Sequence, residues 1–192
     1  MAAAIAPLLI ALASFVLRLV NLGATKGYIF DEVYYVDGAR DLLKYGVEVS
    51  GSSPEFIVHP PVGKWLIGAG IALFGDNEFG WRFATALIGT LLILVFARLV
   101  HVLFYSPLLT ALGAALMALD GLLLVHSRTA LLDLFLTFFV LVGVLLWHRD
   151  RHWWAGLAFG LALGCKWSAV YFIAAIALIS LYRILVNMDV RD

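Results

Sequence analysis

The sequence predicts an all-α polytopic membrane protein, and three observations support this class. The 192 residues are 64% hydrophobic and have a mean hydropathy of +1.00, well beyond what a soluble domain needs for its core. The apolar residues fall into segments of the length that crosses a bilayer, and the polar residues fall between them. The formal net charge is zero, so we expect no nucleic-acid partner.

The first predicted span covers residues 6–22, about the length that the hydrocarbon core of a bilayer requires. A cleaved signal peptide is the alternative, but no basic region precedes the segment and Arg18 lies near its end. We favour a retained anchor, and either choice places the next segment outside the cytoplasm. Residues 23–79 are too polar to cross the membrane and form the predicted outer loop.

Two short helices are expected in this outer loop. The first, over residues 31–45, has the apolar spacing of an amphipathic helix. A predicted turn at 51–54 and the His59-Pro60-Pro61 run, which stops any helix, separate it from the second. The second, over residues 62–74, is apolar but too short to cross. We expect it to lie in the membrane interface, with Trp65 at the level of the headgroups.

Five further apolar segments complete the predicted bundle. They cover residues 81–104, 107–120, 129–147, 153–165 and 168–186. The chain is therefore expected to form a single transmembrane domain, residues 1–192, with about six spans. An inside N-terminus puts Arg98, Arg149, Arg151 and Arg183 on the cytoplasmic side and Arg128 and Lys166 in the short outer turns. This distribution has the positive-inside bias of membrane proteins.

Charged residues gather at the outer face in this orientation. They are Asp31, Glu32, Asp120, Arg128, Asp133 and Lys166. Asp133 stands inside an apolar run, where an ionisable residue costs about 2.5–3.5 kcal/mol on insertion scales, so we expect it to face the bundle interior or a wet cavity. A salt bridge from Asp133 to Arg128 or to Lys166 is an alternative that is compatible with a role in a site.

The adjacent carboxylates of Asp31 and Glu32 are the strongest candidates for chemistry. Aromatic residues flank them, and they lie where the chain leaves the first span. Partnership with a helix dipole is the structural alternative for such a pair. Tyr34 and Tyr35 fit either a sugar or lipid groove or an interfacial belt, and His59 is expected to order its loop rather than to bind a metal.

The residues alone therefore predict a cavity that opens outward and is lined by carboxylates and two cations. A carboxylate suits a base or a cation, whereas Arg128 and Lys166 suit a phosphate. Together they favour a reaction on a phospholipid substrate in the membrane. A transporter is the main alternative, but transporters place such charges near the midplane on broken helices. A non-catalytic membrane subunit is a third.

Several stretches resemble the protein O-mannosyltransferase family, especially its bacterial members, within the GT-C class of membrane glycosyltransferases. In the family's order they are residues 30–35 (FDEVYY), 58–64 (VHPPVGK), 80–82 (GWR), 119–121 (LDG), 127–133 (SRTALLD) and 164–168 (GCKWS). The resemblance implies a GT-C-like transmembrane helix bundle. Because family members are longer, with further spans and a second outer region, we expect the chain to be the N-terminal portion of a GT-C domain.

The resemblance also implies a function. Mannose would pass, with inversion, from a polyprenyl-phosphate-mannose donor to Ser or Thr hydroxyls of exported proteins; a related GT-C reaction on a lipid or glycan acceptor is the alternative. It implies Asp31 as the catalytic base with Glu32 in support, and Arg128 and Lys166 near the donor phosphate. Further candidate substrate-binding residues are Asp133, Asp120, His59 and Tyr35. We expect no metal and no cofactor.

These implications also define location and partners. We expect a multi-pass protein of the cell membrane whose active site faces the extracytoplasmic side. Its expected partners are the lipid donor, the protein acceptor, membrane lipid and the secretion translocon.

Overall fold

The fold is almost entirely helical in the computed structural model, which describes residues 2–50, 53–54 and 58–189. The helices are α1 (Ala2–Leu19), α2 (Glu32–Tyr45), α3 (Val62–Phe74), α4 (Glu78–Phe104), α5 (Pro107–Leu119), α6 (Gly121–His126), α7 (Leu132–His148), α8 (His152–Cys165) and α9 (Ala169–Asp189). Two short strands, β1 (Val49–Ser50) and β2 (Ser53–Pro54), pair antiparallel. The predicted all-α class is confirmed, and residues 51 and 52 of the predicted turn lie outside the described residues.

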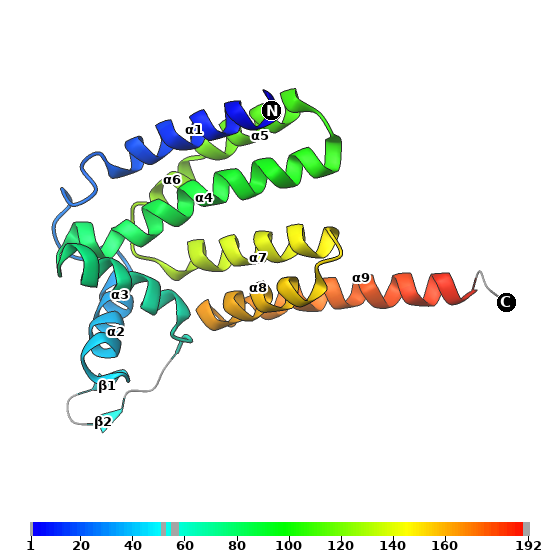
Figure 1. Ribbon diagram of the computed structural model, residues 1–192. Coiled ribbons are helices and arrows are strands. Elements are labelled where there is room, and N and C mark those ends of the chain that lie inside the picture. The colour runs from blue at the N-terminus through cyan, green and yellow to red at the C-terminus, as the bar shows by residue number, and fades with distance from the viewer. Residues whose placement is uncertain (1, 51–52, 55–57, 190–192) are drawn as a thin grey trace.

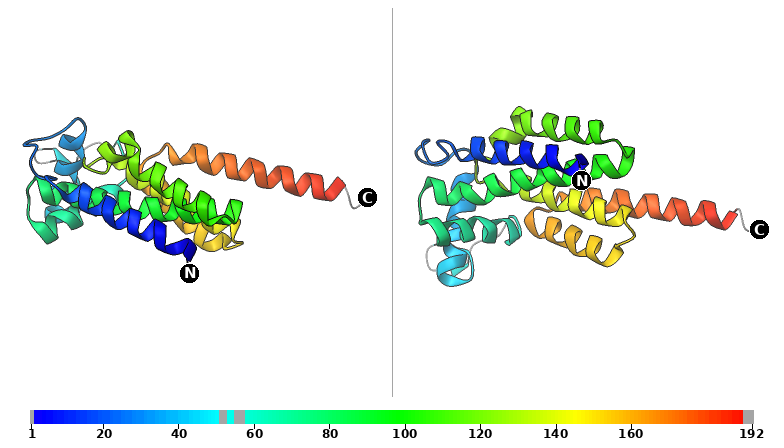
Figure 2. Two further views of the ribbon diagram at one scale, coloured as in Figure 1. Left: turned by 90° about the horizontal axis from the view of Figure 1, so that it is seen from above. Right: turned by 45° about the horizontal axis from the view of Figure 1, so that its top comes forward.

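The long helices form a bundle around α4. Helix α4 packs against α1, α5 and α7, and α7 packs against α8, so that these axes run side by side (Figures 1 and 2). Helices α2 and α3 gather with the hairpin at one end of the bundle, and α9 extends beyond the opposite end. Helices α2 and α3 belong to the predicted outer loop, residues 23–79, so this end of the bundle corresponds to the predicted outer side.

The helix ends differ from the predicted ones where polar side chains cap the backbone. Helix α4 begins at Glu78 because the Asn77 side chain accepts hydrogen bonds from two backbone N–H groups of its first turn. The predicted third span ends where expected, since α5 ends at Leu119; the carboxylate of Asp120 then accepts from the N–H of Leu123 at 2.7 Å and starts the additional short helix α6. Helix α7 begins at Leu132, three residues later than expected, and the N–H of Ala130 in the segment before it donates to the carboxylate of Glu32 in α2 at 2.7 Å.

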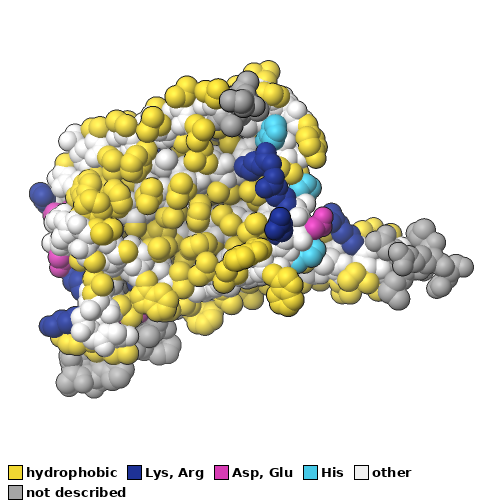
Figure 3. All heavy atoms as spheres, viewed as in Figure 1, with side chains coloured by type: hydrophobic (Ala, Val, Ile, Leu, Met, Phe, Trp, Pro, Cys, Tyr) yellow, Lys and Arg dark blue, Asp and Glu magenta, His cyan; other side chains and the backbone are white. Residues whose placement is uncertain are grey.

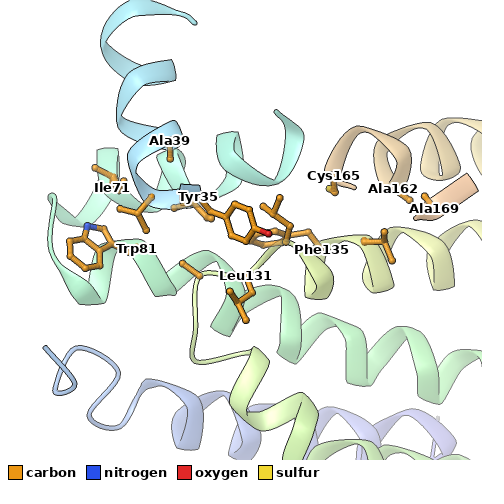
Figure 4. Packing of buried hydrophobic residues seen from close by; sticks show 14 of the residues in the cluster. Tyr35, Ala39, Ile71, Trp81, Leu131, Phe135, Ala162, Cys165 and Ala169 are labelled. Carbon is orange, nitrogen blue, oxygen red and sulfur yellow. The ribbon is translucent and has the colours of Figure 1, made fainter. Parts of the chain in front are cut away.

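The main hydrophobic cluster lies where α2 and α3 meet the bundle. Val36 and Ala39 of α2, Ile67 of α3 and Leu132 and Phe135 of α7 are completely buried there. Figure 4 shows Tyr35 reaching from α2 toward Phe135, with Cys165 of α8 on the same side. This packing fixes the start of α2, with Asp31 directly before it and Glu32 in its first turn, against the start of α7.

The lateral surface of the bundle is apolar. Hydrophobic side chains cover much of the face in Figure 3. Two helices, Glu78–Phe104 and Ala169–Val186, are long and apolar enough to cross a membrane, and four shorter apolar helices accompany them. Apolar side chains of α9, such as Leu178 and Leu185, are more than half exposed. Contiguous apolar surface of this extent is suited to lipid rather than to water.

A glycine lets α3 and α4 approach each other closely. A Cβ added to Gly70 of α3 would lie 2.3 Å from the carbonyl oxygen of Gly80 in α4. That contact is with backbone, which cannot move aside as a flexible side chain can. The close packing of α3 against α4 therefore requires a residue without a side chain at position 70.

We expect the change Gly70→Ala to lower the free energy of unfolding by about 1–3 kcal/mol, because the extra methyl overpacks the helix contact. The measurement is chemical unfolding of the purified protein in detergent. Gly160→Ala in α8 is the matched control, since nothing lies within 4 Å of the added Cβ and alanine favours the helix. Equal stability of the Gly70 variant and wild type would contradict this account of the contact.

Candidate active site

Asp31 lies directly before α2, and its carboxylate does not cap the helix. The residue before it, Phe30, has a positive φ of 54°, so the chain turns sharply into the helix. The Asp31 side chain makes no capping hydrogen bond to the backbone of α2. One turn later the hydroxyl of Tyr35 donates to its Oδ2 at 3.4 Å. The half-buried carboxylate is thus held near the helix start without serving as its cap.

Glu32, the next residue, is completely buried and fully bonded. Its two oxygens face Arg82 of α4, with Nε at 2.8 Å from Oε1 and Nη2 at 2.7 Å from Oε2. Two backbone N–H groups complete the set: Ile29 donates to Oε2 at 2.8 Å and Ala130 to Oε1 at 2.7 Å. A carboxylate with four such donors has no lone pair left for a substrate. Glu32 therefore supports Asp31 by fixing the position of the chain at the start of α2.

Arg82 also binds the segment that follows α1. Besides Glu32, its guanidinium donates to the carbonyl oxygens of Leu22, Thr25 and Gly27, at 3.4, 2.9 and 2.9 Å. The guanidinium therefore holds the segment between α1 and α2 as well as α2 itself. The sequence analysis did not assign Arg82 this role, although an arginine within the first turns of an apolar span is a signal for such a partner.

Asp31 lines a cavity of about 430 Å³ beneath α2. The cavity is bounded by Asp31, Val33, Tyr34, Tyr35, Asp37, Gly38, Glu48, Val58, His59 and Lys64. Its wall contains a buried ion pair between Lys64 of α3 and Glu48. One oxygen of Glu48, Oε1, and one ring nitrogen of His59, Nδ1, are buried there without a partner among the described residues. Sequence analysis missed this pair; the signal was a lysine within the apolar stretch 62–74.

Lys166 and Asp133 form the second charged pair of the site. Lys166 Nζ lies 2.7 Å from Asp133 Oδ1 between α8 and the first turn of α7. Of the two partners that the sequence allowed for Asp133, the structure therefore shows Lys166. The indole N–H of Trp167, the next residue, donates to the carbonyl of Val58 at 3.0 Å. This bond brings the end of α8 to the loop that carries His59.

The electrostatics of the site show that these groups act on one another. Burial lowers the pKa of His59, and the positive charges of Lys166 and Lys64 lower it further. Burial raises the pKa of the Tyr35 hydroxyl, and the negative charges of Asp31 and Asp133 raise it further. At pH 7 the imidazole is therefore neutral and the phenol keeps its proton.

Two predicted site residues have other contacts. Arg128 donates from Nη1 to the carbonyls of Leu17 and Arg18, at 2.9 and 3.0 Å, and so closes the end of α1. Asp120 caps α6. The structure brings Asp31, Tyr35, His59, Asp133 and Lys166 together through the contacts above, but it links neither Arg128 nor Asp120 to them by a bond. Substrate binding by these two residues stays a prediction.

Metal-binding geometry is not found in the part of the chain that the structure describes. No three His, Cys, Asp or Glu side chains of residues 2–50, 53–54 and 58–189 gather as ligands. The ionisable side chains that the site contains include carboxylates, two lysines and the neutral His59.

Comparison with known proteins identifies similar sequences. Residues 58–189 match a family model described as dolichyl-phosphate-mannose-protein mannosyltransferase. The polyprenol-phosphate-mannose–protein mannosyltransferases of Mycobacterium tuberculosis (strain H37Rv) and Corynebacterium glutamicum are 40% and 32% identical to the chain, over 86% and 80% of its length. An undecaprenyl phosphate-α-4-amino-4-deoxy-L-arabinose arabinosyl transferase of Pseudomonas aeruginosa is 35% identical over 63% of the chain.

The chain spans 38%, 36% and 23% of the length of these three relatives. No solved structure gives a significant match to it.

We expect Glu32→Gln to lower the free energy of unfolding by about 3–5 kcal/mol, because Arg82 would keep its charge in a buried site without a counter-charge. Unfolding in detergent measures this loss. The control is Glu78→Gln, whose partner Lys26 is mostly exposed, so that this change should cost much less stability than Glu32→Gln. A Glu32 variant as stable as the control would refute the central role of the pair.

Proposed function

The chain belongs to the dolichyl-phosphate-mannose-protein mannosyltransferase family, and from this membership we propose that it carries the catalytic base of a membrane mannosyltransferase. The reaction transfers mannose from a polyprenyl-phosphate-mannose donor to Ser or Thr hydroxyls of exported proteins. The observation that supports it most directly is the Asp31 carboxylate, which is not used as a helix cap and lines a cavity.

Asp31 acts in this proposal as the general base. A Ser or Thr hydroxyl is a weak nucleophile until a positioned group accepts its proton. The hydroxyl oxygen attacks the anomeric carbon and forms the new C–O bond, while the bond from that carbon to the donor phosphate breaks. Asp31 takes the proton, and the phosphate leaves with its electron pair. A single displacement of this kind inverts the anomeric centre and needs no second carboxylate as acid.

Lys166 is the cation proposed to face the donor phosphate. Its positive charge acts on His59 of the cavity wall, and its side chain is 25% exposed. Arg128 is a second candidate, since its contacts to α1 use one of its terminal nitrogens, Nη1. Tyr34, which is 69% exposed beside the cavity, and Val58 offer apolar surface to a sugar face or an acceptor peptide.

The proposed setting is a multi-pass protein of the cell membrane with the Asp31 end outside the cytoplasm. The two long apolar helices and the apolar lateral surface support the membrane setting. Membrane lipid surrounds the bundle in this setting, and acceptor chains arrive from the secretion translocon. The arginine-rich opposite end would then face the cytoplasm.

A second candidate keeps the polyprenyl-phosphate donor and changes the transferred sugar or the acceptor. It is favoured by the similarity to the aminoarabinose transferase, whose name specifies another sugar on undecaprenyl phosphate. The two candidates separate in a transfer assay that offers labelled mannose on polyprenyl phosphate with either a Ser/Thr-rich peptide or membrane lipids as the acceptor.

The nearly isosteric change Asp31→Asn should lower mannose transfer by about 10²–10⁴-fold, the usual contribution of a positioned base, and should leave donor binding unchanged. The transfer rate is measured with radiolabelled mannose and a Ser/Thr peptide in membranes that contain the full-length protein. Donor binding is measured as the labelled donor that these membranes retain. Asp150→Asn, at a side chain that is 94% exposed, is the control. Near-normal turnover of the Asp31 variant would move the role of the base to Asp133 or Asp120.

Topology is tested by cysteine labelling in intact cells. A cysteine at Val47, which is 51% exposed, should react with an impermeant maleimide, whereas one at Asp150 should react after the membrane is opened. The native Cys165 is buried and should give no background. The reverse labelling pattern would place the candidate site in the cytoplasm and exclude the proposed acceptors.

A further inference from the structure

The end of the bundle that lies opposite Asp31 carries a second cavity, lined by basic side chains. It has a volume of about 330 Å³ and is bounded by Arg98, His101, Val102, Tyr105, His148 and Arg149. A neighbouring hollow of about 540 Å³ shares Arg149 and adds Leu146, Arg151 and Trp154. Figure 3 shows arginine and histidine atoms concentrated at this end of the bundle. The last turns of α4 and the α7–α8 turn supply the lining.

The arginines of this cavity carry uncompensated charge. Within the described ranges, none of Arg98, Arg149 and Arg151 forms an ion pair with a carboxylate. Asp150 stands in the same turn, but the basic side chain nearest to it is His152, at 3.9 Å, and its own side chain is 94% exposed. Three guanidinium groups thus stand against one solvent-exposed carboxylate, which leaves a site that attracts an anion.

The cavity lies at the depth of lipid headgroups if α4 spans the membrane. Arg98 follows Glu78, at the start of α4, by twenty residues, which corresponds to about 30 Å along a helix. That distance equals the thickness of the hydrocarbon core, so a bilayer that meets Glu78 at one surface meets Arg98 at the other. Trp153 and Trp154, 93% and 60% exposed, stand at this same end, as aromatic residues do at membrane interfaces.

The surroundings fit a phospholipid better than a small soluble anion. A volume of about 330 Å³ equals that of about ten water molecules and has room for a phosphodiester. Beside the cavity, Leu103 and Phe104 at the end of α4 are 52% and 60% exposed and provide an apolar surface for acyl chains. Arginine forks bind phosphate oxygens in pairs, and Arg98 and Arg149 come from two different elements on the cavity wall.

We propose that the cavity between Arg98 and Arg149 binds the headgroup phosphate of an anionic membrane phospholipid. The arginines take the phosphate oxygens, Tyr105 borders the headgroup, and the acyl chains lie along the end of α4. The site is separate from Asp31 and does not depend on the transfer reaction. Bound lipid would tie the α7–α8 turn to α4 and so hold the bundle together at the end away from the catalytic cavity.

The test is a lipid titration of the purified full-length protein in detergent, followed by native mass spectrometry. Phosphatidylglycerol should bind more tightly than phosphatidylcholine of the same acyl chains. Arg98→Gln and Arg149→Gln should each weaken phosphatidylglycerol binding about five-fold, the usual share of one basic residue at an anionic headgroup. Arg183→Gln, an exposed arginine of α9 outside the cavity lining, should leave binding unchanged.

Three outcomes would overturn the proposal. They are equal affinity for the two lipids, an equal loss in the Arg183 variant, and displacement of the lipid by inorganic phosphate at matched concentration, which would indicate a site for a small anion. Unfolding temperatures in lipid-free detergent show whether each variant is folded. Because the comparison of the two lipids uses the wild-type protein, it decides the question even where a variant fails to fold.

Discussion

The buried ion pair between Glu32 and Arg82 is the interaction on which the rest of the structure depends. It joins the start of α2 to α4. Through hydrogen bonds to backbone groups it also holds the connection between α1 and α2 and the residues directly before α7. A buried pair is stable when every oxygen and N–H finds a partner, and breaking it exposes a full charge to an apolar interior. Three regions that are distant in sequence, residues 22–32, the start of α4 at Arg82 and the segment at Ala130, are therefore fixed at one point.

The position of Asp31 follows from that pair. Successive residues of a helix project about 100° apart, so burying Glu32 against Arg82 turns the preceding residue toward another side. On that side lie Tyr35 and the cavity. The two adjacent carboxylates thus have different environments: one is saturated by four donors, and the other is half-buried with one weak contact. In the proposed reaction, Asp31 is available as the base because its neighbour Glu32 is the residue that is anchored.

Sequence predicted much of the fold because the signals for it are local. Apolar segments, prolines and the Asp-Glu pair mark the helices and the site, and residues 62–74 form a helix with the bounds expected. The bond from the N–H of Ala130 to Glu32 was not predictable, since the two residues are ninety-eight positions apart. The pairing of Glu32 with Arg82 and of Lys64 with Glu48 likewise requires the tertiary fold. Residue types alone left Asp133 with two possible partners, and packing selected Lys166.

The pairing of Lys166 with Asp133 bears on how the proposed chemistry can work. A base and a phosphate-binding cation must both lie close to the reacting carbon, yet a direct bond between them would stabilise the ionised carboxylate and weaken it as a proton acceptor. Asp133 engages Lys166 at 2.7 Å, and no bond joins Lys166 to Asp31 among the described residues. His59 stays neutral between these charges because burial and the two lysines oppose its protonation. In the proposed mechanism, Asp133 of α7 therefore positions Lys166 for the donor phosphate, while Asp31 stays available to the acceptor hydroxyl.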